Sequence, residues 1–228
     1  MTADLIAAAH GTADPRGIRE VHSLVRMMAR RRPDVPVSLG FVDVDVPALP
    51  SLVSRVVADS NQAVVVPLLL SSGYHVYVDI AAEVDRWPGR VQAAPALGPD
   101  PVLAEVLADR LGKLSRVDRV VMAAAGSSDR RALLDCSETA ALLSAHIDRP
   151  VEVGYISGAG EHLTSVLART PGRVAVATYL LAPGFFADKV HRLAAGRPVS
   201  PPLGADPRIA ALALRRYQAA LRSVAVAV

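Results

Sequence analysis

Two histidines stand directly after apolar runs in the first half of the sequence. His10 follows residues 5–9 and precedes Gly11, which permits a tight turn and close approach of a ligand to the backbone. His75 comes shortly after a second apolar run, residues 63–70. Two imidazoles suit a borderline divalent metal such as Fe²⁺, Co²⁺, Ni²⁺ or Zn²⁺, and two protein ligands leave coordination positions open for an ion that is passed on. Either histidine alone is better explained as a polar strand-end residue that is hydrogen-bonded to nearby backbone.

Several carboxylates lie near these histidines in the sequence. Asp43 follows another short apolar segment and would be placed to steer a cation or to accept protons from a reacting N–H group. Asp14 precedes a proline and a helical pattern, so we interpret it as a helix N-cap, and Asp129 repeats that arrangement without a nearby histidine. Asp79 lies four residues after His75 and would either orient its ring or cap the next helix.

The elements that must position these residues alternate between short apolar runs and segments of helical period. The expected strands are residues 5–9, 36–42, 63–70 and 90–94, and the expected helices are residues 15–31, 49–57 and 102–111. This order predicts an α/β fold with a mostly parallel sheet and helices on both faces. Ligand sites in such sheets form beyond the carboxyl ends of the strands. We therefore expect the loops that begin at His10, Asp43 and Ser71 to converge on one rim.

The sequence also repeats itself at a spacing of 106 to 115 residues. The matching segments are 9–14 with 125–129, 69–74 with 180–185, and 95–101 with 201–207. Three matches in the same order indicate an internal duplication, with its boundary near residues 113–117. We predict an N-terminal lobe of residues 1–114 that carries the metal site, and a duplicated C-terminal lobe of residues 115–228.

The two copies differ where chemistry is expected. The first copy holds imidazoles and a carboxylate, whereas the second holds apolar or neutral side chains at the matching places. The pairs are His10 with Ala125, His75 with Phe186, and Asp43 with Ser157. The fold would then be common to both halves, and the chemistry would be confined to the first.

Composition excludes several classes of protein. Of 228 residues, 51% are hydrophobic and 21% are charged, which allows a sizeable core and excludes a largely disordered chain. A single cysteine, Cys136, excludes a disulfide scaffold, and its helical context predicts a packed side chain. The formal net charge of +3 is scattered rather than gathered in a basic stripe, so we expect no nucleic-acid partner. No run has the length of a membrane span or an export leader, so we expect a cytoplasmic protein without a membrane partner.

Three motifs resemble the sirohydrochlorin chelatases. Residues 5–16, LIAAAHGTADPR, are similar to the family's opening, in which an apolar strand runs into HGSxDPR. Residues 41–43, FVD, are similar to the family's FLE, with Asp in place of Glu. Residues 65–80, VVPLLLSSGYHVYVDI, resemble its VVPLFLxxGxHxxxDI segment. The resemblance covers the first half closely and the second half through the duplication.

The resemblance implies a class II tetrapyrrole chelatase with two similar α/β lobes that face a central cleft. Such an enzyme inserts a divalent metal into sirohydrochlorin, with release of two protons and no organic cofactor. The family's metal ligands map onto His10 and His75, and its acidic residue maps onto Asp43. We favour Fe²⁺, which gives siroheme, over Co²⁺ for cobalamin synthesis, and the protein would be a monomer or a homodimer. The expected substrate contacts are Gly11, Arg16, Ser71, Ser72, Gly73 and Tyr74.

Two other readings of the sequence remain distinct from this one. Histidine phosphatases also begin with a strand and His-Gly, but they need an arginine directly before that histidine, and Ala9 stands there. A non-catalytic carrier of tetrapyrroles or metals would use the same cleft without releasing a metallated ring. Catalytic turnover separates an enzyme from such a carrier.

Overall fold

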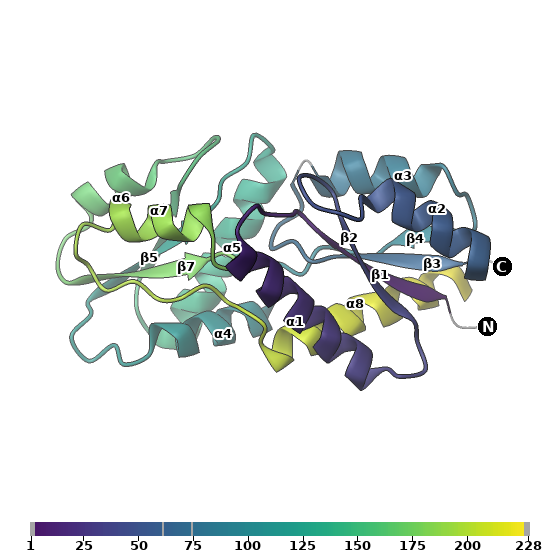
Figure 1. Ribbon diagram of the computed structural model, residues 1–228. Helices are drawn as coiled ribbons and strands as arrows, with labels where there is room; N and C mark the ends of the chain where they lie inside the picture. Colours follow the sequence, from purple (N-terminus) through teal and green to yellow (C-terminus); the bar gives the residue numbers. More distant parts are fainter. Residues whose placement is uncertain (1–2, 61, 74, 226–228) are drawn as a thin grey trace.

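The computed structural model describes residues 3–60, 62–73 and 75–225, and it gives only the backbone course of residues 75–77 and 223–225. Two parallel sheets form the centres of two lobes (Figure 1). The first sheet has the order β2-β1-β3-β4, and its strands are β1 (Asp4–Ala9), β2 (Val37–Phe41), β3 (Ala63–Pro67) and β4 (Val91–Ala93). The second has the order β6-β5-β7, and its strands are β5 (Arg119–Ala124), β6 (Val151–Tyr155) and β7 (Val174–Tyr179). The predicted α/β fold with two similar lobes is confirmed.

Several helices begin at an aspartate that caps them. Asp14 accepts a hydrogen bond from the backbone N–H of Arg16 at 2.8 Å, and Asp129 accepts one from that of Arg131 at 2.9 Å, so both predicted N-caps are confirmed. The helices are α1 (Pro15–Arg31), α2 (Leu49–Ser60), the π-helix η1 (His75–Ile80), α3 (Ala81–Asp85), α4 (Pro101–Leu111), α5 (Arg130–Ile147), α6 (Leu163–Arg169), α7 (Phe185–Leu193) and α8 (Pro207–Ala225). None of them, over the residues that the structure describes, has the length and apolar character to cross a membrane.

One strand is shorter than predicted. The apolar run 63–70 forms a strand only as far as Pro67, although the N–H of Leu68 still donates to the carbonyl of Ala8 at 2.7 Å. The remaining apolar residues, 69 and 70, leave the sheet and line a cavity. A continuous apolar run in the sequence is compatible with a buried strand and with an apolar cavity wall, which explains why the strand is shorter than predicted.

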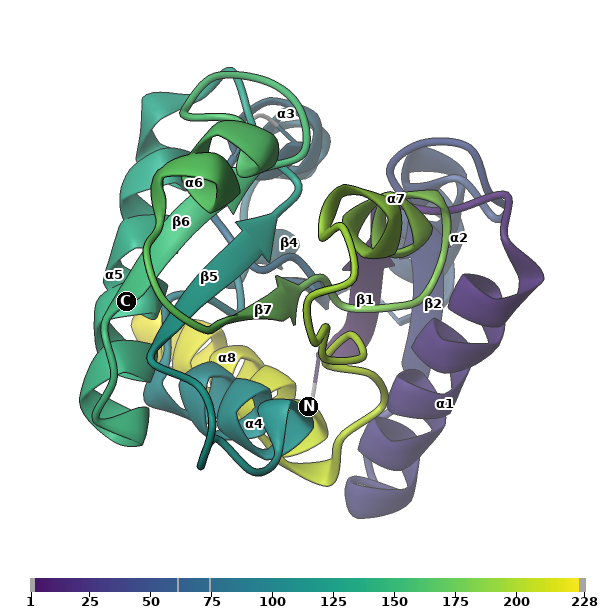
Figure 2. The same cartoon turned by 90° about the vertical axis from the view of Figure 1, so that its left-hand side faces the viewer.

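The two halves of the chain exchange their last helices. Helix α4, from the first half, packs on α5 and β7 of the second lobe, and α8, from the second half, packs on α1 and β3 of the first (Figures 1 and 2). As a result, one hydrophobic core extends through both lobes. The boundary between residues 114 and 115 stays a prediction about the sequence, since each half completes the lobe of the other.

The repeated segments 95–101 and 201–207 hold this exchange in place. The guanidinium of Arg110 donates twice to the carbonyl of Leu203, at 2.8 and 3.0 Å. Arg216, which lies 106 residues later, donates to the carbonyls of Ala96 and Leu97 at 3.1 and 3.0 Å. The aspartate of each segment then caps the exchanged helix, Asp100 on α4 and Asp206 on α8. The repeat therefore has a structural role in both halves.

Candidate functional site

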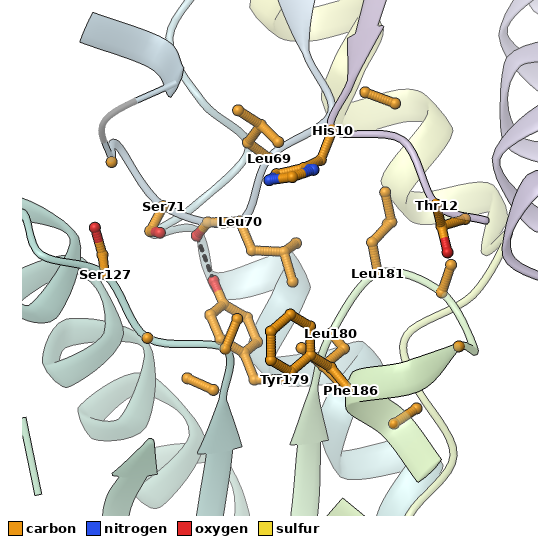
Figure 3. A pocket seen from close by; sticks show the side chains of 18 of the residues that line it. His10, Thr12, Leu69, Leu70, Ser71, Ser127, Tyr179, Leu180, Leu181 and Phe186 are labelled. Atoms are coloured by element: carbon orange, nitrogen blue, oxygen red, sulfur yellow. Dashed lines mark hydrogen bonds between the residues drawn. The ribbon is translucent and has the colours of Figure 1, made fainter. Parts of the chain in front are cut away.

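The carboxyl ends of strands from both sheets meet at one cavity of about 730 Å³ (Figure 3). Its lining comes from both lobes, as the duplication predicts for a shared cleft. The main lining segments are 9–12 and 68–71 from the first lobe, and 124–128 and 179–187 from the second. Both lobes contribute hydroxyls and aromatic rings, whereas the imidazole among the described lining residues, that of His10, comes from the first lobe.

His10 stands on the wall made by the first lobe. It follows β1 directly, and its exposed side chain projects into the cavity beside Leu69 (Figure 3). Gly11 has φ +101°, and a Cβ there would lie 3.2 Å from a methyl of Val44, so the turn after His10 requires glycine. The carboxylate of Asp45 accepts a hydrogen bond from the N–H of Thr12 at 2.7 Å and fixes this turn. The sequence motifs did not indicate this role of Asp45.

Asp43 lies beside His10 through the main chain. Its N–H donates to the carbonyl of His10 at 3.1 Å, which places the two predicted residues at adjacent strand ends. The side chain of Asp43 is exposed and lies outside the cavity lining. Its part in proton transfer stays a prediction.

The loop that leads to His75 is attached to the opposite lobe. The hydroxyl of Tyr179 donates to the carbonyl of Leu70 at 2.7 Å, and the carboxylate of Asp135 accepts from the N–H of Ser72 at 2.6 Å. Burial raises the pKa of Tyr179, so its hydroxyl remains a donor over any working pH. Asp135 and Tyr179 are distant in sequence from this loop, and no local pattern marked them. Of the predicted substrate contacts here, Ser71 and Gly73 line the cavity, whereas Ser72 is not among the lining residues.

Two predicted residues fall in the least described part of the chain. Tyr74 lies outside the described residues, and so does the side chain of His75. The backbone of His75 begins the π-helix η1, a rare conformation that is frequent at functional sites. Asp79 follows in the same helix. The prediction that the two imidazoles share one metal therefore remains a prediction.

Arg16, the predicted basic substrate contact, lies outside the cavity lining and joins the two lobes. Its guanidinium binds Asp14 at 2.6 Å and, from the second lobe, Asp188 of α7 at 2.7 Å. The hydrogen bonds from Arg16 lower the pKa of Asp14 to about 2, so that carboxylate is charged at any ordinary pH. The positive charge of Arg16 is thus already paired with two carboxylates of the protein.

The wall from the second lobe offers few metal ligands. Ser157, which stands opposite Asp43 in the duplication, donates its hydroxyl to the carbonyl of Ala125 at 2.8 Å. Cys136 lines the cavity but is buried, and this burial raises the pKa of its thiol to about 12. Among the described side chains, no cluster of three or more His, Cys, Asp or Glu residues could hold a metal ion. Among the described residues, those that line this wall include no His, Asp or Glu, and the reliance of a metal site on the first lobe stays a prediction.

Comparisons with known proteins agree with this architecture. A family model described as CbiX matches residues 4–114 and again residues 119–220. The structure of SirB from Bacillus subtilis with Fe³⁺ superposes with a TM-score of 0.81 at 21% identity, covering 99% of this chain and 98% of that one. SirB from Bacillus subtilis subspecies spizizenii in complex with cobalt gives 0.78 at 23% identity, covering 96% and 94%.

A third structure extends the comparison. CbiX, described as the terminal enzyme for biosynthesis of siroheme in denitrifying bacteria, gives a TM-score of 0.71 at 18% identity and covers 95% of this chain and 99% of that one. A search of the curated proteins found no match. The two ranges matched by the family model agree with the internal duplication.

Proposed function

We propose, from the premise that this chain belongs to the CbiX family, that it is a sirohydrochlorin chelatase that inserts Fe²⁺ and so produces siroheme. The observation that carries the proposal is the cavity between the lobes, with the imidazole of His10 on one wall. A cavity of about 730 Å³ with largely aliphatic walls suits a flat conjugated ring, whose carboxylates would remain at the open edge.

The proposed reaction assigns a role to each of the predicted site residues. His10 and His75 receive the incoming cation at one face of the macrocycle, and the ring nitrogens replace them as ligands. Two ring N–H protons leave as the metal enters, which balances the charge of the divalent ion. Asp43 or a histidine accepts a proton and passes it to solvent. No organic cofactor takes part in this scheme.

The choice of metal is a separate part of the proposal. Imidazole ligands accept both Fe²⁺ and Co²⁺, and affinity alone does not determine which one a site uses. The similar SirB structures contain Fe³⁺ in one case and cobalt in the other. We propose Fe²⁺ as the natural substrate and cobalt insertion as the alternative activity. A cytoplasmic location and a cavity completed within one subunit belong to the same proposal.

A spectroscopic assay tests the activity. The protein is mixed anaerobically with sirohydrochlorin and either Fe²⁺ or Co²⁺, and the visible spectrum is followed through many equivalents of substrate. Turnover supports a chelatase, whereas a change that stops at one equivalent supports a carrier.

A variant series tests the site. Replacement of both His10 and His75 by alanine is expected to abolish insertion, while His22→Ala serves as the control, since His22 is an exposed histidine on α1 outside the cavity lining. If the double variant inserts metal at the normal rate, the assignment of the two histidines is wrong.

A further inference from the structure

Two consecutive aromatic residues are exposed at the start of α7. Phe185 and Phe186 are 67% and 39% exposed, and they are two of only three phenylalanines in the chain. Both line the cavity. The other lining aromatic side chains that the structure describes are buried, namely Phe41, Tyr155 and Tyr179. An exposed aromatic pair contributes little to the core, so a ligand is the natural partner for these rings.

The ring of Phe186 faces the wall that carries His10. In Figure 3 Phe186 enters the cavity from the second lobe, and His10 enters it from the first. The rings of Phe185 and Phe186 pack edge to face, with centroids 5.7 Å apart and planes at 67°. Phe185 therefore supports one side of the Phe186 ring and leaves another side to the cavity.

The position of α7 is fixed by contacts to its surroundings. Asp188, one turn away from Phe185, accepts a hydrogen bond from Arg16 of the first lobe at 2.7 Å. Lys189 donates to the carbonyl of Ile156 at 3.2 Å, which ties the helix to its own lobe. An aromatic ring on a helix held at both sides is preorganised, so little conformational entropy is lost when a ligand packs on it.

We infer that Phe186 is a substrate-binding residue that packs against the face of the macrocycle opposite His10. This inference rests on the proposed function, because it takes sirohydrochlorin as the ligand. The flat ring would lie between an aromatic surface from the second lobe and the imidazole from the first. In the duplication Phe186 stands at the position of His75, so the second copy supplies a support for the ring where the first supplies a metal ligand.

Equilibrium binding without metal tests the inference. Sirohydrochlorin fluorescence is titrated with wild-type protein and with Phe186→Ala, Phe186→Leu and Phe186→Tyr. We expect the dissociation constant of Phe186→Ala to be about tenfold higher, because an aromatic contact lowers the dissociation constant by roughly tenfold beyond the effect of burial alone. Phe186→Leu should also bind more weakly because it lacks a flat face, and Phe186→Tyr should bind like the wild type. In steady-state assays KM for sirohydrochlorin should rise more than kcat falls.

Leu134→Ala is the matched control. Leu134 is an exposed apolar residue, 63% accessible, on α5 and outside the cavity lining. Its truncation removes a similar exposed side chain and should leave binding unchanged. Melting temperatures of all variants verify that the fold is retained, and a Co²⁺ titration without sirohydrochlorin should be the same for Phe186→Ala and wild type.

The outcomes separate this inference from the proposed function. If wild-type protein turns over sirohydrochlorin and Phe186→Ala or Phe186→Leu binds it equally well, the aromatic contact is overturned and the chelatase remains. If Phe186→Ala weakens binding but the wild type shows no turnover, the contact stands and the chelatase is overturned in favour of a carrier. If the wild type does not bind sirohydrochlorin, both are overturned.

Discussion

The two lobes share a scaffold and differ in the side chains that they present to the cavity. Three strands of each lobe have equivalent order, β2-β1-β3 in the first and β6-β5-β7 in the second. Each lobe also has an aspartate cap after its first strand and receives a helix from the other half. At the strand ends, however, His10 stands in one lobe where Ala125 stands in the other. The scaffold is thus common to both lobes, and the prediction that only the first lobe binds a metal depends on a few positions at the strand ends.

Moving the imidazole across the cavity is the strongest test of this difference. His10→Ala should reduce metal insertion by about 100-fold or more, because a direct ligand should matter at least as much as the groups that orient it. Adding Ala125→His to this variant should not restore activity, because the second lobe has Phe186 where the first lobe has its second histidine, His75. Initial rates of the spectral change measure both effects.

The control for this experiment is His22→Ala, which removes an imidazole from the surface of the same lobe. Rescue by Ala125→His would contradict the asymmetry, because it would make the two walls interchangeable. Loss of activity in His22→Ala would instead point to a general effect of histidine removal.

The shared scaffold leads to a second prediction, about stability. Arg110→Met and Arg216→Met each remove hydrogen bonds to backbone carbonyls of the partner half, and each should lower the free energy of unfolding by about 1–3 kcal/mol. The two losses should be similar, because the arginines occupy equivalent positions. Urea unfolding measures them, and Arg222→Met, an exposed residue of α8, is the control. Strongly unequal losses in the free energy of unfolding would show that the two exchanged helices do not contribute equally to stability.

Short-range patterns in the sequence predicted the scaffold well. Apolar runs and capping aspartates placed β1 and α1 nearly at their observed bounds, and Asp129 marked the start of α5. The repeat around residues 95–101 and 201–207 revealed the duplication, but not the helix exchange that it stabilises. Local periodicity predicts that a helix has an apolar face, and it does not indicate which sheet that face covers.

The cavity was predictable in part. Strand-end placement brought His10 and Ser71 to the lining, since the carboxyl ends of parallel strands share an edge. Arg16 was expected to contact substrate, but ion pairs with carboxylates of both lobes hold it beside the cavity. The hydrogen bonds that Asp135 accepts and Tyr179 donates span many residues of sequence, so only the folded chain reveals them.

A third prediction concerns this attachment between the lobes. Tyr179→Phe removes the hydrogen bond to the carbonyl of Leu70, so the loop that leads to His75 should lose part of its support. We expect a loss of about 1 kcal/mol in the free energy of unfolding and a lower rate of insertion. Tyr217→Phe is a matched control, because Tyr217 donates to the carbonyl of Ala3 in the core away from the cavity. Equal effects of both variants on insertion would contradict a specific role for the attachment.

Cys136 gives the smallest and most discriminating test, because it is a potential metal ligand in the lobe that should have none. In the duplication it corresponds to Val21, and both residues line the cavity. Burial, with a smaller contribution from the charge of Asp135, raises the thiol pKa to about 12. The thiol therefore remains protonated at neutral pH and packs as a small apolar group like its valine counterpart.

Alkylation kinetics measure this state of the thiol. At pH 8 an ordinary thiol is about one quarter thiolate, whereas one with a pKa near 12 is roughly two thousandfold less ionised. Iodoacetamide should thus modify Cys136 in urea within minutes and leave the folded protein almost unmodified, as followed by mass spectrometry. Rapid modification of the folded protein would place a thiolate at the cavity wall. The second lobe would then offer a metal ligand of its own, and the division of chemistry between the lobes would no longer hold.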